Sequence, residues 1–425
     1  MRTPKIMVTQ QSRAGSRSIE SLGPKTKLYA PAFAIAPYAA YERMRQGGRT
    51  LAPVELAPNV PATLVIGYHT AVRVLNDPDR FPADPRVWEK SLPDDHPLLP
   101  MLGWRPNALR TAGKEHAFHR DALQTALSVV DLHAVRERTI RVAASLINQF
   151  CQAGEVELIE HFITPLVFTV LNETVGCPPA LGERLRVAIA AMFEGVDTEH
   201  VNAEVAKALF ELIELKRRTP AADIASWLVH RCSNLTDEQR MHQLVTIYSA
   251  GIEPVRNLIA NAIRRMLTAV RYRHDNAHFT PPVRDAVEET LADDPPMANL
   301  CNSYPRQPVL VDRVWLPADQ PVLVSMAACN TDPAIVGNRG WTDNRAHLAY
   351  GSGPHACPDM AREMSKQIAI EAIGHFFDAF PEAELAVAAD EVPWRTGPFH
   401  RAPAAVPVAF PPTAPLIVPP ARAHR

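Results

Sequence analysis

The most chemically informative segment of this chain runs from residue 347 to residue 358 and reads HLAYGSGPHACP. Gly351 and Gly353 let a loop turn tightly and bring its backbone close to a flat ligand. Cys357 then falls where a helix begins, because Pro358 suits the first helical position and good helix formers follow it. Unpaired N–H groups and the positive end of a helix stabilise a thiolate. The pattern therefore predicts a metal ligand or a nucleophile at Cys357 rather than half of a disulfide.

The residues of this segment alone leave other interpretations open. An isolated cysteine in a loop is most often simply buried. A cysteine nucleophile is compatible with the helix start. A zinc site needs four ligands, and His355 with Cys357 supplies only two of them. The rest of the chain has to decide among these.

The same segment resembles the haem-binding loop of the cytochrome P-450 family, whose pattern is F-x-x-G-x-[HR]-x-C-x-G. Tyr350, Gly353, His355 and Cys357 match it, and Asp359 stands where the last glycine is usual. The resemblance implies that haem b is the cofactor, that Cys357 is the thiolate ligand of its iron, and that the loop with Tyr350, Gly351 and Gly353 lies against the haem.

A second motif lies in the long apolar-periodic segment from residue 236 to residue 271. Ala250, Gly251 and Glu253 match the A-G-x-[DE]-T-T motif with which the family activates oxygen, but Pro254 replaces the first threonine. Proline has no side-chain donor, and it leaves the Ala250 carbonyl without its helical partner, which is expected to open or kink the helix. We expect a modified oxygen-activation site in which Gly251 gives room and water replaces the hydroxyl.

Haem propionates are anions and need cationic or N–H partners. The segment GKEHAFHR resembles the family's G-x-E-H-x-x-x-R helix, and His116 and Arg120 within it are four residues apart, so they share one helix face. Arg306 stands where the family places another propionate arginine, and His355 offers a fourth contact. The resemblance thus implies a propionate site of His116, Arg120, Arg306 and His355.

A third motif is incomplete. The family carries E-x-x-R on a helix before the cysteine loop, and here Glu289 is followed by Ala292 in place of the arginine. We expect either that Glu289 is protonated or that Arg339 or Arg345 of the following loop reaches it. Some actinobacterial members that the chain resembles lack this arginine, and some of those are linked to small-GTPase signalling components.

Composition excludes several classes of function. Among the 425 residues, Lys and Arg number 44 and Asp and Glu 46, so no basic surface for nucleic acid is indicated. The first twenty residues contain no apolar run that would serve as a signal or membrane anchor. Six scattered cysteines without paired spacing are typical of a reducing cytoplasm. We therefore expect a soluble cytoplasmic protein without a membrane or nucleic-acid partner.

The order of predicted elements indicates a mainly α protein with minor β structure. Helices are expected near 37–46, 69–76, 136–152, 165–175, 236–271, 282–292 and 359–380, and short strands at 50–56 and 62–68. This layout resembles the single-domain cytochrome P-450 fold, a helix-rich core around haem with small β-sheets. The expected organisation is a disordered segment 1–25, a haem domain 26–410 and a flexible proline-rich tail 411–425.

The resemblance implies a monooxygenase that oxidises a small organic molecule with dioxygen. Electrons would come from a ferredoxin or flavodoxin and its reductase, docking near Cys357, where Arg362 and Lys366 would present positive charge. The substrate pocket is expected around Trp88, 98–104, 192–200 and 247–254. Because of Pro254, an oxidative-coupling or substrate-assisted enzyme is one alternative. A haem-binding regulatory protein with little catalysis is the other.

Overall fold

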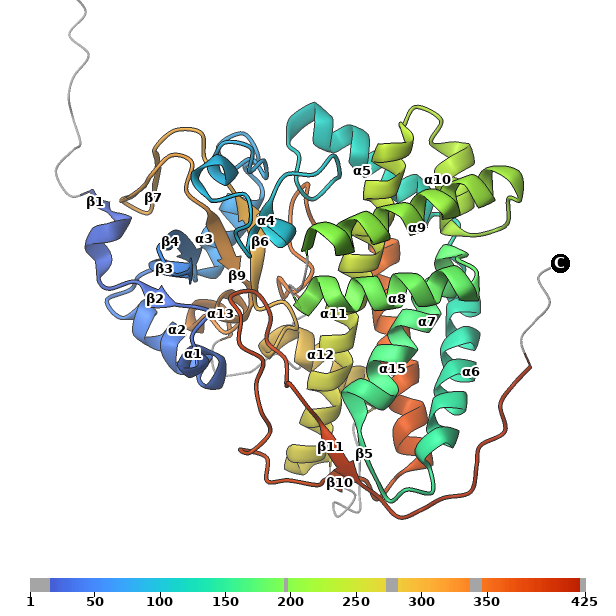
Figure 1. Ribbon diagram of the computed structural model, residues 1–425. Coiled ribbons are helices and arrows are strands. Elements are labelled where there is room, and N and C mark those ends of the chain that lie inside the picture. Colours follow the sequence, from blue (N-terminus) through green and yellow to red (C-terminus); the bar gives the residue numbers. More distant parts are fainter. Residues whose placement is uncertain (1–15, 195–197, 273–281, 337–345, 421–425) are drawn as a thin grey trace, which may run out of the picture.

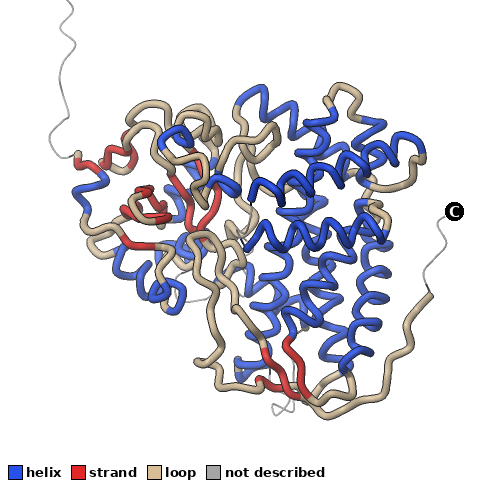
Figure 2. Tube along the Cα trace, in the orientation of Figure 1, coloured by secondary structure: helices blue, strands red, loops and turns tan. Residues whose placement is uncertain are grey.

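A computed structural model describes residues 16–194, 198–272, 282–336 and 346–420. Figure 1 shows long helices gathered on one side of the molecule and small sheets with short helices on the other. Figure 2 shows the same division, with a separate small group of strands below the helices. Each of the two sides has its own hydrophobic core. The predicted mainly α fold with minor β structure is confirmed.

The helical side is built from long amphipathic segments. Its helices are α5 (Gly113–Leu127), α6 (Leu132–Phe150), α7 (Thr164–Val175), α8 (Pro179–Glu194), α9 (Thr198–Arg218), α10 (Ile224–Arg231), α11 (Asp237–Thr268), α12 (Val283–Asp293) and α15 (Asp359–Ala379), with a π-helical turn at Ile159–Ile163. Helix α15 packs against both α6 and α11, so the helix that follows the cysteine loop lies in the middle of this core.

The sheet side holds a five-stranded sheet in the order β2-β3-β4-β9-β6 and a three-stranded sheet in the order β1-β8-β7. The third sheet, β10-β11-β5, lies below the helices. The strands are β1 (Arg17–Ser18), β2 (Thr26–Lys27), β3 (Leu51–Ala57), β4 (Val60–Val65), β5 (Glu155–Glu157), β6 (Asn299–Ser303), β7 (Val309–Val311), β8 (Val314–Leu316), β9 (Val322–Ser325), β10 (Glu384–Leu385) and β11 (Pro407–Ala409).

Short helices connect these sheets to the rest of the chain. They are α1 (Pro31–Ile35), α2 (Pro37–Arg45), α3 (Tyr68–Leu75), α4 (Leu99–Leu102), α13 (Met326–Asn330) and α14 (Pro333–Val336), with 3-10 turns at Ile19–Leu22, Trp88–Ser91 and Val270–Tyr272. None of the helices in the described part of the chain is both long enough and apolar enough to cross a bilayer.

Helix α11 is the axis of the helical side, and its start is set by a capping box. The Thr236 hydroxyl accepts the Gln239 N–H, and the Gln239 amide oxygen accepts the Thr236 N–H at 2.9 Å. The helix then runs unbroken through Pro254. The expected opening of the helix at this proline is therefore not found, because burial of the apolar residues on both sides of it holds the backbone in one helix.

The domain boundaries predicted from sequence need correction at both ends. Residues 16–25 are ordered, since Arg17 pairs with Val314 in a parallel ladder and Ile19 is buried. Near the other end, Asn148 of α6 exchanges two hydrogen bonds with the backbone of Leu416, so the first part of the expected tail is attached. The remainder of both predicted end segments, 1–15 and 421–425, lies outside the described residues.

Candidate functional site

The loop before α15 is tightly folded and packs against the end of α3. The Cys357 N–H donates to the Tyr350 carbonyl at 2.9 Å, and the Tyr350 hydroxyl bonds Ser365 of α15 at 2.9 Å. Gly351 and Gly353 both have φ of 71°. A Cβ on Gly353 would lie 2.2 Å from the Leu75 carbonyl oxygen, so only glycine fits there. The loop therefore holds Cys357 rigidly at the start of α15.

The pKa of the Cys357 thiol is raised, although the start of a helix was expected to stabilise the thiolate. The thiol is half-buried, and this burial raises its pKa to about 11, while Arg362 and Arg120 oppose the shift. The helix start therefore does not by itself produce a thiolate, because desolvation outweighs it. A bound metal ion removes the proton from a coordinating thiol, so the geometry suits a metal ligand better than a free nucleophile.

Two imidazoles meet beside this thiol. The rings of His116 on α5 and His355 lie 3.9 Å apart, and His355 bonds the backbone of Ala108. Burial lowers the pKa of each histidine to about 4, so both are neutral near neutral pH. The Nε2 atom of His116 is buried without a hydrogen-bond partner among the described residues. An orphaned imidazole nitrogen at this place is a donor that an anion would satisfy.

Two arginines complete this group of donors. Arg120, one turn after His116 on α5, interacts electrostatically with Cys357. Among the described residues, no carboxylate lies within ion-pair distance of Arg120. Arg110 interacts with His355 and donates to the Met101 carbonyl. Sequence reasoning missed Arg110, although its position one turn before the start of α5 was a usable signal.

Arg306 does not join this group. Its guanidinium binds the buried carboxylate of Asp84 at 2.5 Å, and Arg86 binds the same carboxylate. The Arg306 side chain is 55% exposed, which places it at the rim of the sheet side. The structure thus brings together His116, Arg120 and His355 of the predicted propionate set and leaves Arg306 with a protein partner.

The central part of α11 presents small residues to an accessible face. Ala250 is exposed and Pro254 is half-buried, although Ile252 and Glu253 between them are buried. Gly251 serves a different purpose from the one expected, since a Cβ there would lie 2.8 Å from the Leu171 side chain. The glycine lets α11 approach α7 closely instead of enlarging a ligand pocket.

Glu253 is held in a buried network rather than left free to move. Its carboxylate accepts from Arg395, from Arg256 at 3.3 Å and from Asn257 at 3.2 Å. These arginines hold the pKa of Glu253 below its ordinary value, despite the opposing effect of burial. The acid that the motif assigns to oxygen activation is therefore paired with two arginines and an asparagine.

Arginines that precede α12 in the sequence contact Glu289 in place of the missing E-x-x-R arginine. Glu289 on α12 accepts from Arg271 and from the Tyr272 hydroxyl at 2.7 Å, and Arg265 of α11 lies 3.9 Å away. Both cations precede α12 in the sequence. The alternative partners Arg339 and Arg345 lie outside the described residues.

Glu288 makes the connection to the cysteine loop. Its two carboxylate oxygens lie 3.7 Å from His347 Nε2 and 3.7 Å from Lys366 Nζ, and all three side chains are largely buried. His347 belongs to the loop and Lys366 to α15. Glu288 thus joins three segments around Cys357.

The different contacts of Glu288 and Glu289 lead to a prediction. Glu288→Gln is expected to loosen the cysteine loop and lower haem retention, whereas Glu289→Gln is expected to lower thermal stability with little loss of haem. Each change weakens half-buried ion contacts, at a cost of about 1 kcal/mol. Haem content after gel filtration and thermal unfolding, measured on both variants, separate the two roles. Equal haem loss in both variants would contradict this assignment.

The surface next to Cys357 is less positive than expected. Arg362 is paired with Asp359, and Lys366 contacts Glu363 at 2.9 Å as well as Glu288. The two basic side chains proposed to attract an acidic partner are therefore both engaged by carboxylates. Their attraction for such a partner is correspondingly reduced.

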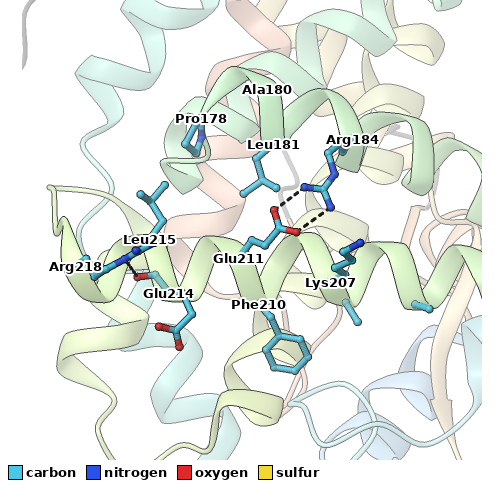
Figure 3. Close-up of a pocket in the computed structure, with 12 residues that line it drawn as sticks. Pro178, Ala180, Leu181, Arg184, Lys207, Phe210, Glu211, Glu214, Leu215 and Arg218 are labelled. Carbon is cyan, nitrogen blue, oxygen red and sulfur yellow. Dashed lines mark hydrogen bonds and ion pairs between the residues drawn. The ribbon is translucent and has the colours of Figure 1, made fainter.

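A pocket of about 900 Å³ lies elsewhere, between α8 and α9 (Figure 3). Leu181 and Phe210 contribute to its mainly apolar wall, and Arg184 binds Glu211 across it at 2.6 Å. None of its lining residues belongs to the cysteine loop, α5 or α11. This pocket is therefore not the site of the chemistry centred on Cys357.

Comparisons with known proteins agree with the geometry. Cytochrome P450 monooxygenase PikC of Streptomyces venezuelae is 28% identical over 417 residues, which cover 95% of this chain and 97% of that protein. Cytochrome P450 107B1 of Saccharopolyspora erythraea is 26% identical over 388 residues, covering 86% and 92%. The solved structure of CYP154C4 from Streptomyces superposes with a TM-score of 0.81 at 23% identity, covering 92% and 99%. No family model matches the chain.

The homologues of this chain are bacterial cytochrome P450s, and its fold is that of solved P450 structures. Members of this family are monooxygenases, and they bind haem b through a cysteine thiolate. The residues of this chain fit that cofactor. A half-buried thiol lies at the start of α15, and the orphaned His116 nitrogen and Arg120 are donors suited to propionates.

Proposed function

We propose that this protein inserts one oxygen atom of dioxygen into a small organic substrate while the other leaves as water, using two electrons and two protons. Cys357 would ligate the haem iron, and bound haem would supply the redox chemistry that activates dioxygen. The observation that carries the proposal is the meeting of Cys357 with the unpaired donors of His116 and Arg120 in this fold. PikC, a monooxygenase by name, supports the same reaction type.

The protein's own residues would anchor the cofactor by its acidic edge. His116 and Arg120 project from one face of α5, and His355 adds a third contact from the loop. Charge-assisted hydrogen bonds from these groups would neutralise the propionates. The loop of Tyr350, Gly351 and Gly353 would lie against the flat face, and the contact of Gly353 with the Leu75 carbonyl would fix its position.

Proton supply would differ from that of relatives with a threonine. Pro254 offers no hydroxyl, and Glu253 is ionised and bound to Arg395. We infer that protons reach the site through water near the exposed Ala250 face, or through a hydroxyl of the substrate itself. The second route is the oxidative-coupling or substrate-assisted alternative.

Electrons would come from NAD(P)H through a ferredoxin or flavodoxin and its reductase. The partner would dock near Cys357, although Arg362 and Lys366 are already engaged by carboxylates. A cytoplasmic location is consistent with the free thiols of Cys151, Cys177, Cys232 and Cys357. The remaining alternative is a haem-binding regulatory protein, with small-GTPase signalling components as partners, and the absence of turnover with any redox partner would favour it.

Pro254 leads to a prediction about coupling, which is the share of consumed NADPH that yields product rather than peroxide. With a surrogate ferredoxin, its reductase and NADPH, wild-type protein is expected to lose much of its consumed NADPH as peroxide on generic substrates. Pro254→Thr restores a hydroxyl and a backbone N–H, and we expect about a tenfold gain in the ratio of product to peroxide. Parallel assays of NADPH, peroxide and product measure this ratio. Unchanged coupling in a folded variant would show that water or substrate already relays the protons.

A further inference from the structure

Arg105, in the loop between α4 and α5, is a half-buried cation without an acidic partner. Its guanidinium donates to the Pro100 carbonyl at a long 3.3 Å. Among the described residues, no carboxylate lies within 4 Å of it. Burial lowers its pKa, and no partner offsets this effect. A planar guanidinium with free N–H groups is costly to keep in such a place unless something binds it.

The side chains around Arg105 also lack partners. The indole Nε1 of Trp104 and the Nδ1 of His242 are both buried without a hydrogen-bond partner among the described residues. His242 belongs to α11, and the charge of Arg105 contributes to the lowering of its pKa. Arg105 and the unsatisfied imidazole of His242 thus come from segments distant in sequence and are close enough for their charges to interact. The Trp104 ring lies against Arg86.

The acidic groups that could serve Arg105 are already occupied. Glu89 accepts the Trp104 backbone N–H at 2.6 Å, and Glu115 is bound by Arg86 at 3.0 Å. Arg86 also holds Asp84. These carboxylates thus have other partners, and Arg105 has no carboxylate partner among the described residues.

The position of Arg105 relates it to the site of oxidation. His242 precedes Ala250 by eight residues on α11, which corresponds to about 12 Å along the helix. Ala250 is the exposed position of the oxygen-activation segment. Arg105 follows directly on the segment 98–104, which the sequence predicted to line the substrate pocket. A substrate extending from Ala250 along α11 toward His242 would approach this cation.

We propose that Arg105 binds a carboxylate of the substrate, with Trp104 and His242 around it. The substrate class would therefore be an organic acid oxidised at a carbon remote from its carboxylate. A single planar guanidinium matches the charge and the paired oxygens of one carboxylate. This inference rests on the proposed function, because it places the substrate of that same site.

Binding measurements on the haem-loaded protein test this assignment. The probes are dodecanoic acid and dodecanamide, which share one skeleton and differ in charge. Wild-type protein is expected to bind the acid at least about tenfold more tightly than the amide. Arg105→Gln is expected to bring this ratio close to one while amide affinity stays unchanged, and Arg105→Lys is expected to keep part of the preference. Titrations are followed by the haem spectrum and by calorimetry.

Matched controls make the outcome decisive. Arg80→Gln removes a surface arginine that pairs with Asp77 and should leave the ratio unchanged. An unaltered carbonyl spectrum shows that Arg105→Gln has folded. Equal binding of acid and amide by wild type, or a preserved preference in Arg105→Gln, would overturn the proposal. Calorimetry reports binding without product formation, so an absence of oxygenation would count against the proposed function and not against this carboxylate site.

Discussion

Replacement of Cys357 by serine is expected to abolish the long-wavelength absorption band that marks the carbonyl complex of a reduced haem-thiolate protein. The reason is local, because the rigid loop presents one sulfur at the start of α15 and serine oxygen does not donate electron density as a thiolate does. Oxygenation should fall to the background rate. Reduced carbonyl difference spectra, together with haem content, measure both effects.

A matched cysteine distinguishes the ligand from a general loss of structure. Cys151 lies at the end of α6, is buried and is free. Cys151→Ser should keep the long-wavelength band even if it loses some stability. A Cys357→Ser protein that retains the band would eliminate Cys357 as the iron ligand.

A large loss of stability is expected on replacement of Glu253, because its buried carboxylate is paired with two arginines. Glu253→Leu would leave Arg395 and Arg256 without their anion, at a cost of about 3–5 kcal/mol in the free energy of unfolding. Denaturant unfolding of the haem-loaded protein measures this cost. Loss of the contact would also free the segment around Arg395 from α11.

The same carboxylate gives a pH dependence of defined sign. The pKa of Glu253 is lower in the folded protein than in the unfolded chain, so its stabilisation is complete above the unfolded value of about 4.3. That contribution is lost as pH falls through the folded pKa. Wild type should therefore lose stability in acid more steeply than Glu253→Leu.

An exposed pair provides the comparison. Glu183 binds Arg186 at 2.7 Å on the surface of α8, and solvent screens this interaction. Glu183→Gln should change the free energy of unfolding far less than Glu253→Leu does. If Glu253→Leu changed the free energy of unfolding as little as Glu183→Gln, the buried network would not stabilise the fold.

Local patterns in the sequence were sufficient for most elements. The period of apolar residues predicted a helix over 236–271, and α11 spans Asp237–Thr268. The segments expected as helices at 282–292 and 359–380 are α12 and α15 within one residue at each end. Helix starts depend on caps and burial periodicity within a few residues, so they can be read from neighbouring positions. The cysteine loop was recognisable for the same reason.

The choice of charged partners was decided only by tertiary structure. Glu253 and Arg395 are 142 residues apart, and Arg306 reaches Asp84 across 222 residues. Glu289 is bound by Arg271, which precedes it in the sequence, whereas the expected Arg339 and Arg345 lie outside the described residues. A long, flexible arginine side chain pairs with whichever carboxylate the packing of other elements brings within reach. Sequence therefore determined the cysteine loop and the helices that hold it. Packing decided which cations are paired with carboxylates and which, such as Arg105, have no carboxylate partner among the described residues.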